Sequence, residues 1–302
     1  MANAKELKDR IRSVGDTRKI TNAMYLIASM KMRKAKAELD GTRPYFEAIR
    51  GEIKRIFRTV QDVQSQYFYP DSSEPPLHGP YACLVITADK GLAGMYNQNV
   101  IKKAEAMLVQ YPDTKLFVVG EYGARHKIPV ERSFLYTAQN PTMQRAREIS
   151  EILLELFRSS AAQKIFVLYT DMKNGLSEEA RLERLLPFHR GTFASAAAEH
   201  TGQPIFEFTP SVGVVLDSII PSYVSGYIYS ALVDSFCSEQ NARMTAMRSA
   251  GQNAEKLLTQ LSGQYNRLRQ AAITREITEI SSGAKAQKQA IKKKQNAEVS
   301  VL

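Results

Sequence analysis

The segment of this chain best suited to ligand chemistry is Thr87–Asn97, TADKGLAGMYN, which directly follows a short apolar run. A glycine-bearing turn between a strand and a helix is where α/β proteins bind phosphates, because the first N–H groups of the helix point outward there. Gly91 and Gly94 give the spacing GxxG, however, rather than GxGxxG, and the GK[ST] ending of a P-loop is absent. We interpret the segment as a structural turn in which Asp89 and Asn97 accept hydrogen bonds from nearby backbone N–H groups, with a degenerate ligand site as the alternative.

The remaining candidates for catalysis or metal binding do not form recognisable patterns. The histidines lack the i,i+3 or i,i+4 spacing of a metal site, and the carboxylate pairs Glu178–Glu179 and Glu148–Glu151 lie in charged stretches that we expect to be solvated helix faces. Cys83 and Cys237 lie far apart without CxxC spacing, which favours free thiols over a disulfide or a zinc site. We therefore expect no catalytic residue, cofactor or metal. The four histidines are His78, His126, His189 and His200.

An α/β body positions the turn. Short runs rich in Val, Ile and Phe occur at Ala82–Thr87, Leu116–Val119 and Lys164–Thr170, and helical stretches such as Gln98–Gln110 and Gln144–Ser160 separate them. This alternation predicts right-handed crossovers and a Rossmann-like domain with a mostly parallel sheet, which we place at 81–215. Two further apolar runs, Pro204–Thr209 and Val212–Val215, are candidate edge strands.

The last third of the chain has no proline after Pro221, and its apolar residues recur with a spacing of 3.5 residues. That period is typical of a coiled coil, so we predict a coiled-coil helix over 222–286. A helix of about 60 residues is on the order of 90 Å long and needs a partner. The stripe consists of Phe236, Met247, Ala250, Ala254, Leu257, Leu261, Leu268 and Ala272.

The N-terminal residues 1–60 supply that partner, because they again show a helical apolar pattern with phase slips. Pro44, preceded by Gly41, predicts a break or kink near Gly41–Tyr45, with a further helical run from Phe46 to about Val60. Residues 61–80 have the proline-rich composition of a linker. Residues 287–302 form a basic tail, which we interpret as a solvated extension or, alternatively, as an added contact surface.

Charge divides along these boundaries. Residues 1–58 carry 15 Lys and Arg against 7 Asp and Glu, residues 222–302 carry 11 against 6, and residues 59–221 carry 15 against 18. The net charge of +10 therefore belongs to the helical arms, which indicates acidic or phosphate-bearing partners. No run of eighteen apolar residues and no signal-peptide pattern is present, so we expect no membrane-spanning segment.

Several blocks of the chain resemble the gamma subunit of bacterial F-type ATP synthases, and together they cover nearly its whole length. The C-terminal pattern Ile273-Thr274-x-Glu276-x-x-Glu279-x-x-x-Gly283-Ala284-x-Ala286 fits the signature of that family. Met95 and the pair Tyr25-Leu26 depart from the family pattern, and we interpret these differences as packing changes. The other matching blocks are TRKITNAM at Thr17–Met24, KMRKA at Lys31–Ala35, TRPYF at Thr42–Phe46, ADKGLAGMYN at Ala88–Asn97, Ser238–Ala254 and Asn266–Ala284.

The resemblance implies a rotor shaft without catalytic residues of its own. The two arms would wind into an antiparallel coiled coil inside a ring of alternating alpha and beta subunits. The body would contact the epsilon subunit and the membrane c-ring, on the cytoplasmic side of the cell membrane. Neither nucleic acid nor a second copy of this chain would be a partner. The residues implied to contact beta are Arg269, Gln270, Thr274, Glu276 and Glu279, with Met24, Lys31 and Arg33 as neighbours.

Two other functions remain open at this point. A basic coiled-coil scaffold would bind duplex nucleic acid or anionic membrane, and its binding would weaken with salt. A nucleotide-binding enzyme would use the Thr87–Asn97 turn and would bind ATP or NAD through residues 75–215 alone. The sequence does not indicate whether H⁺ or Na⁺ is the coupling ion, because the ligands of that ion belong to the membrane subunits.

Overall fold

The computed structural model describes residues 4–59, 65–69, 79–126, 128–135, 138–173, 177–189, 208–209 and 211–299. These residues belong to two compact units. Unit 1 comprises Met1–Ala23 and Met247–Leu302, and unit 2 comprises Met24–Ala246. The two longest helices, α1 (Ala4–Thr59) and α6 (Val212–Val299), contribute residues to both units.

A five-stranded sheet in the order β4-β3-β2-β5-β6 forms the centre of unit 2. β2 pairs in parallel with β3 and β5, β3 pairs in parallel with β4, and β5 pairs antiparallel with β6. The predicted mostly parallel sheet is thus confirmed, with one antiparallel edge strand added. The strands are β2 (Tyr81–Ile86), β3 (Lys115–Val119), β4 (Val130–Phe134), β5 (Lys164–Lys173) and β6 (Ser177–Leu186).

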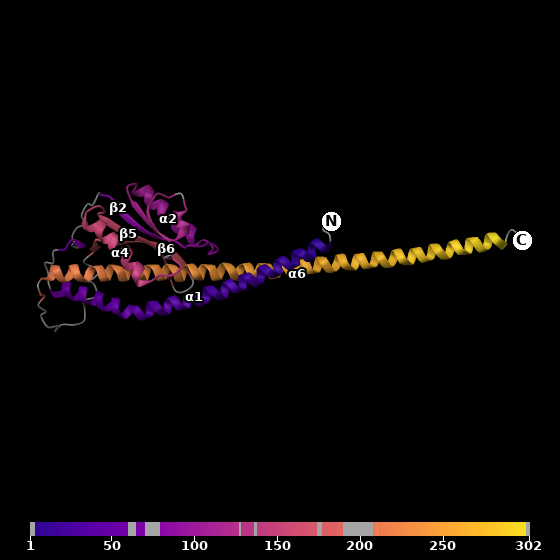
Figure 1. Ribbon diagram of the computed structural model, residues 1–302, viewed down its shortest axis with the longest axis horizontal. Helices are drawn as coiled ribbons and strands as arrows, with labels where there is room; N and C mark the ends of the chain where they lie inside the picture. Colours follow the sequence, from indigo (N-terminus) through magenta and orange to yellow (C-terminus); the bar gives the residue numbers. More distant parts are fainter. Residues whose placement is uncertain are drawn as a thin grey trace. The chain divides into compact units, whose positions relative to one another are not determined.

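Both faces of the sheet are covered, which explains why its central strands are continuous apolar runs rather than alternating ones. Cys83 and Val85 of β2 pack with α2 (Tyr96–Gln110). Leu84 and Ile86 point to the opposite face and pack with α4 (Met143–Arg158) and with parts of α1 and α6. Figure 1 shows α2 and α6 on opposite sides of the sheet. Because successive side chains of a strand point to opposite faces, each central strand contributes to two apolar cores.

The short elements of unit 2 connect these layers. α3 (Glu121–Ala124) follows β3, and its Gly123 lies against Thr87. Two-residue strands β1 (Phe68–Tyr69) and β7 (Phe188–His189) pair in parallel. Tyr67, beside β1, is completely buried.

Within each unit, α1 and α6 pack antiparallel, as the coiled-coil prediction requires. In unit 1, Arg18 forms an ion pair with Glu255 at 3.1 Å, and the Cβ that Gly251 lacks would lie 3.5 Å from Thr21 Oγ1. In unit 2, Cys237 Sγ lies 3.9 Å from the Met32 carbonyl oxygen, and Gly226 faces the ring of Phe46 so closely that a Cβ would lie 2.0 Å from its Cδ1. Residue numbers on α6 thus fall as those on α1 rise.

One 18-residue stretch of α6 has a mean hydropathy of 1.2, which meets a length-and-composition criterion for a membrane-crossing helix. Core helices also meet this criterion. In unit 2 the α6 residues Val224, Ile228 and Leu232 are buried in the same apolar core as α1, α4 and the sheet. The absence of a membrane-spanning segment stays a prediction.

Several local expectations were wrong. α1 continues through Pro44 without a break, and the expected helical run from Phe46 is part of this helix as far as Thr59, whereas a kink near Gly41–Tyr45 stays a prediction. Val212–Val215 begins α6 instead of forming an edge strand, and most of the other candidate strand, Pro204–Thr209, lies outside the described residues. The expected linker 61–80 contains β1, and Glu178–Glu179 belong to β6 rather than to a helix. α6 runs to Val299 and so includes most of the expected tail 287–302.

Candidate functional site

Polar side chains hold the turn after β2 in place. The Asp89 carboxylate accepts hydrogen bonds from the backbone N–H of Glu121 at 3.0 Å and of Gln139 at 2.9 Å. The Asn97 side-chain oxygen accepts from the N–H of Ala88 at 2.9 Å. Both side chains are buried, so these oxygens serve backbone donors inside the protein. The carboxylate that could have faced a ligand instead binds the start of α3 (Glu121–Ala124) and the loop at Gln139.

The backbone of the turn depends on two glycines. Gly94 has φ +54°, in the left-handed region that an L side chain rarely adopts. Gly120, after β3, has φ +94°, and a Cβ there would lie 2.3 Å from the carbonyl oxygen of Thr87. The ends of β2 and β3 can approach each other only because Gly120 has no side chain.

A polar face of α6 meets this turn. Arg243 Nη2 donates to the carbonyl oxygen of Gly91 at 3.0 Å and, more weakly, to that of Lys90 at 3.4 Å. Arg243 Nη1 lies 2.6 Å from Glu239 Oε1, one helical turn earlier. Both charged residues are buried, with 9% and 4% of their surface exposed. A guanidinium paired on one side and bound to carbonyls on the other satisfies the rule that buried charges need partners.

Glu239 is the most buried carboxylate of this group. Burial raises the pKa of the Glu239 carboxyl, whereas the adjacent Arg243 guanidinium opposes the shift, and Lys31 on α1 acts in the same direction as Arg243. Lys31, which the sequence resemblance implies to be a contact of the shaft, therefore also contributes to the electrostatic surroundings of the Glu239–Arg243 ion pair. Removal of Arg243 alone would leave a buried carboxylate without its ion-pair partner.

The same face of α6 holds β5. Ser235 Oγ accepts from the backbone N–H of Thr170 at 3.1 Å, and Ser238 Oγ donates to the Thr170 carbonyl at 3.2 Å. Ala242 packs against a small cluster made by Ala88, Ala93 and Tyr96, in and next to the turn. α6 is therefore bonded both to the turn that follows β2 and to β5 near its carboxyl end.

This arrangement decides what the body can bind at that edge. In open α/β sheets, ligands bind outside the carboxyl ends of the strands where the strand order reverses, which here lies between β2 and β5. α6 occupies that place, and the Arg243 guanidinium bonds to the turn. The geometry favours a structural joint over a nucleotide site.

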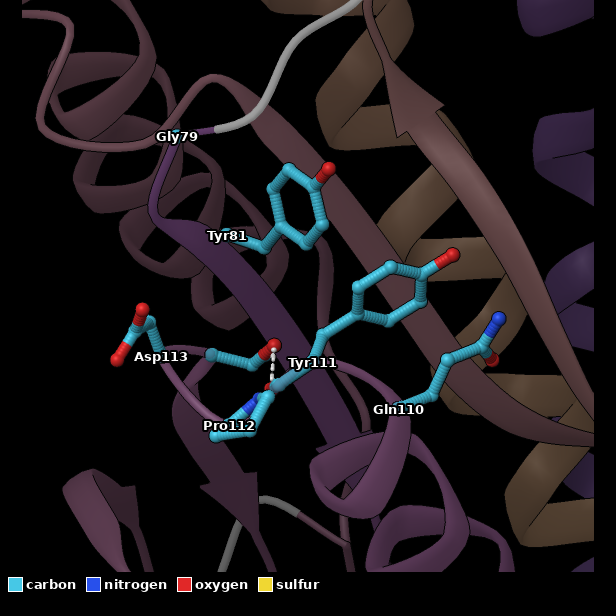
Figure 2. A pocket seen from close by; sticks show the side chains of 7 residues that line it. Gly79, Tyr81, Gln110, Tyr111, Pro112 and Asp113 are labelled. Atoms are coloured by element: carbon cyan, nitrogen blue, oxygen red, sulfur yellow. Dashed lines mark hydrogen bonds between the residues drawn. The ribbon is translucent and has the colours of Figure 1, made fainter.

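A separate pocket of about 210 Å³ lies at the opposite, amino end of β2 and β3 (Figure 2). Its wall includes Tyr81 and Tyr111, whose rings meet edge to face with centroids 5.1 Å apart. Figure 2 shows the Asp113 carboxylate pointing away from both rings. The Thr114 hydroxyl is already bonded to the Tyr111 carbonyl at 2.8 Å. The polar groups therefore do not converge on a common ligand position.

The structure places the proposed beta contacts on helices of both units. In unit 1, the five α6 residues are all exposed. Thr274 donates its hydroxyl hydrogen to the Gln270 carbonyl at 2.9 Å, and Glu279 accepts from Arg275 at 3.0 Å. In unit 2, Lys31 and Arg33 are exposed and Met24 is half-buried on α1. The five α6 residues are Arg269, Gln270, Thr274, Glu276 and Glu279.

Among the residues that the structure describes, no group of three or more His, Cys, Asp or Glu side chains is arranged to hold a metal ion. Cys83 and Cys237 are free and buried. His126 lies in the turn after α3, and His189 belongs to β7. His78 and His200 fall outside the described residues.

Sequence reasoning missed the polar face of α6. Ser235, Ser238, Glu239 and Arg243 are buried, although the coiled-coil pattern assigned burial to apolar residues alone. The available signal was the run SEQNAR at Ser238–Arg243, which lies between Phe236 and Met247 of the apolar stripe. It indicates that this part of the helix contacts polar backbone rather than another apolar helix face.

The chain is similar to known proteins over almost its full length. A family model described as ATP synthase matches residues 3–287. The ATP synthase gamma chain of Caldanaerobacter subterraneus subsp. tengcongensis is 44% identical over 289 residues, which cover 91% of this chain and 97% of the relative. A gamma chain of Acetobacterium woodii described as sodium ion specific is 34% identical, and the match covers 94% and 98% of the two chains.

Solved structures share the fold. A chain from the rotational state 3 structure of the OSCP/F1/c-ring of the Euglena gracilis mitochondrial ATP synthase has a TM-score of 0.63 at 14% identity, with 94% of each chain covered. A chain from the central stalk/c-ring structure of the Tetrahymena thermophila mitochondrial ATP synthase has a TM-score of 0.55 at 20% identity, covering 76% of this chain and 99% of that chain. At these identities the similarity establishes the architecture.

Proposed function

The chain belongs to the ATP synthase gamma-chain family, and we propose that it is the rotating central stalk that couples transmembrane ion flow to ATP synthesis and hydrolysis. Torque from the membrane rotor turns the body and its helices, and the helices act on the catalytic beta subunits. This chain transmits work and has no catalytic residue of its own.

The observation that carries the proposal is the exposure of α6 in unit 1. Every residue from Asn266 to Gln289 is exposed, including Ile273, Ile277 and Ile280 at 43%, 61% and 69%. These isoleucines follow i, i+4, i+7 spacing and so share one helix face. An exposed apolar face of this length is typical of an interaction surface. A ring of alternating alpha and beta subunits around the helix would cover it.

The coupling mechanism needs a shaft whose faces differ. Each conformation of beta is selected only if it interacts differently with the helix face turned toward it. The α6 residues Arg269, Gln270, Thr274, Glu276 and Glu279 present cationic, amide, hydroxyl and anionic groups next to the exposed isoleucines. Lys31 and Arg33 add positive charge on α1, which suits acidic segments of beta.

The body has a mechanical role in this account. Its turn at 87–97 is bonded internally and to Arg243, which supports a structural function and argues against nucleotide chemistry at that edge. The body would contact the epsilon subunit and the c-ring, so that the chain is a peripheral subunit on the cytoplasmic side of the cell membrane. The net charge of −3 for residues 59–221 distinguishes that part from the basic arms.

Co-expression with alpha and beta subunits tests this function. We expect native mass spectrometry to detect a complex with one copy of this chain and three copies each of alpha and beta. Ile277→Lys places a charge on the apolar face and should reduce the yield of complex at least tenfold. Val109→Lys is the matched control, because Val109 is an exposed apolar residue on α2 of the body, and its complex should form normally.

Two results would contradict the proposal. One is a chain that remains separate from alpha and beta while it binds duplex DNA or anionic vesicles in a salt-dependent way, as a basic scaffold would. The other is saturable ATP binding to the unassembled chain that Asp89→Ala abolishes.

A further inference from the structure

The polar face of α6 that packs on the sheet is an unusual joint between a helix and a sheet. Ser235, Ser238, Glu239 and Arg243 are each at least nine-tenths buried, and each bonds to a fixed partner. The two serines and the arginine bond to backbone groups of Thr170, Lys90 and Gly91, which apolar side chains would leave without these bonds. The joint is therefore held by directed contacts as well as by burial.

Directionality distinguishes these contacts from apolar packing. The hydrophobic effect depends on buried area and is non-directional, so an apolar helix face can slide or turn slightly and repack. Hydrogen bonds weaken steeply when the donor–hydrogen–acceptor angle falls below about 120°. Ser235 and Ser238 bond to the N–H and the C=O of the same residue, Thr170, which admits one position of the helix.

A second anchor lies two helical turns further along. Arg243 donates to the carbonyls of Lys90 and Gly91, on a different strand connection from Thr170. Viewed along the helix axis, Ser238 and Arg243 lie about 60° and about 80° to either side of Ser235, so the three anchors spread over a wide face of the helix. Rotation of α6 about its axis by one residue, about 100°, would break all of these bonds together.

We propose that this polar joint fixes the rotational phase of α6 relative to the body, and that torque passes between them through it. Ser235, Ser238 and Arg243 are the positioning residues, and Glu239 orients the Arg243 guanidinium. This inference rests on the proposed function, because a rotational phase matters only in a chain that transmits rotation.

Single-molecule rotation of the complex with alpha and beta subunits tests the proposal. The ring is fixed to a surface, and a bead is attached to the body through Val109→Cys. Val109 is 84% exposed, whereas Cys83 and Cys237 are buried, so labelling is selective. During rotation the bead pauses at fixed angles, and each pause is called a dwell. The variance of the bead angle within a dwell reports the torsional stiffness between the bead and the ring of alpha and beta subunits.

Ser235→Ala/Ser238→Ala should increase that variance at least twofold and leave the ATP hydrolysis rate without load unchanged. Glu239→Gln/Arg243→Gln, which neutralises both charges of the pair, should have the same effect. Arg18→Gln/Glu255→Gln is the matched control, because it neutralises an exposed ion pair between α1 and α6 in unit 1 and should not change the variance.

A variant that only destabilises the body separates stiffness from stability. Ile149→Val removes a buried methyl group on α4 and should lower the melting temperature without widening the dwells. Unchanged dwell variance in both polar variants would overturn the inference, and so would equal broadening by Ile149→Val. If a double variant does not assemble, Ser235→Ala and Ser238→Ala are tested singly against the same criterion. An unsubstituted complex that hydrolyses ATP without rotating would instead overturn the proposed function.

Discussion

Two carboxylates on neighbouring turns of α6 in unit 2 have opposite electrostatic surroundings. Glu239 is paired with Arg243, whereas Asp234 lies near the carboxylate of Asp171 on β5. Burial, and after it the charge of Asp171, raises the pKa of Asp234 from 3.8 to about 6. A hydrogen bond from Ser230 at 3.4 Å and the charge of Arg43 on α1 only partly oppose this shift.

The raised pKa of Asp234 predicts a specific dependence of stability on pH. The folded chain binds this proton more tightly than the unfolded chain, so the contribution of Asp234 to stability is greatest below about pH 4 and is lost as pH rises past 6. Asp234→Asn removes the cost of ionisation and should stabilise the chain at pH 7.5 by up to about 3 kcal/mol.

Urea unfolding of the full chain and of Asp234→Asn at pH 5, 6 and 7.5 measures this difference. The stabilisation should shrink steadily as pH falls. A difference that stays constant over this range, or that grows toward pH 5, would be inconsistent with a raised pKa of Asp234.

At the level of elements, the central strands and long helices could be predicted from the sequence because their patterns are local. β2, β3 and β5 are continuous apolar runs, since helices cover both sheet faces. β6 could not be recognised, because its sequence SEEARLERLL has charges at helical spacing. Its charges instead pair across strands, as Arg181 does with Asp171 at 2.6 Å. The strand is specified by its partner β5, which local patterns do not contain.

In the candidate site, too, the local sequence indicates some residues, whereas contacts between distant segments could not be predicted. Asp89 and Asn97 lie within one short segment, and their residue types suggested hydrogen bonds to backbone donors in that segment. The observed donors of Asp89 are distant in sequence, at Glu121 and Gln139. Arg243 lies 152 residues along the chain from Gly91, whose carbonyl it binds. Such a contact depends on how α6 packs on the sheet.

The close approach of α1 and α6 in unit 2 predicts a large effect from a small substitution. A Cβ at Gly226 would lie 2.0 Å from Cδ1 of Phe46, so Gly226→Ala forces the two helices or the ring to shift. Overpacking of this kind should destabilise the chain by about 1–3 kcal/mol. Gly15→Ala is the control, since nothing lies within 4 Å of its added Cβ, and it should stabilise α1 by about 0.5–1 kcal/mol.

Chemical denaturation of both variants distinguishes packing from helix propensity. Equal stabilisation by Gly226→Ala and Gly15→Ala would mean that α1 and α6 do not approach each other as closely at Gly226 as the structure indicates.

At the scale of the whole molecule, the chain combines a body whose polar turn is hydrogen-bonded within the protein with a helical end whose side chains are exposed. The turn at 87–97 is bonded inside the protein, whereas residues 266–289 of α6 present exposed isoleucines and charges. α6 continues to Val299, beyond residue 287 where the family match ends. An added contact between the basic residues of this segment and the ring of alpha and beta subunits stays a prediction. Deletion of residues 288–302 tests it.

Rotation is the most direct test of the central claim that this chain is the shaft of an ATP synthase. A complex with alpha and beta subunits is fixed through its ring, and a bead attached through the Val109→Cys substitution reports movement of the body. With ATP, we predict continuous rotation in one direction with three ATP-dependent dwells per turn. A complex that hydrolyses ATP while the bead remains at one angle would contradict the account.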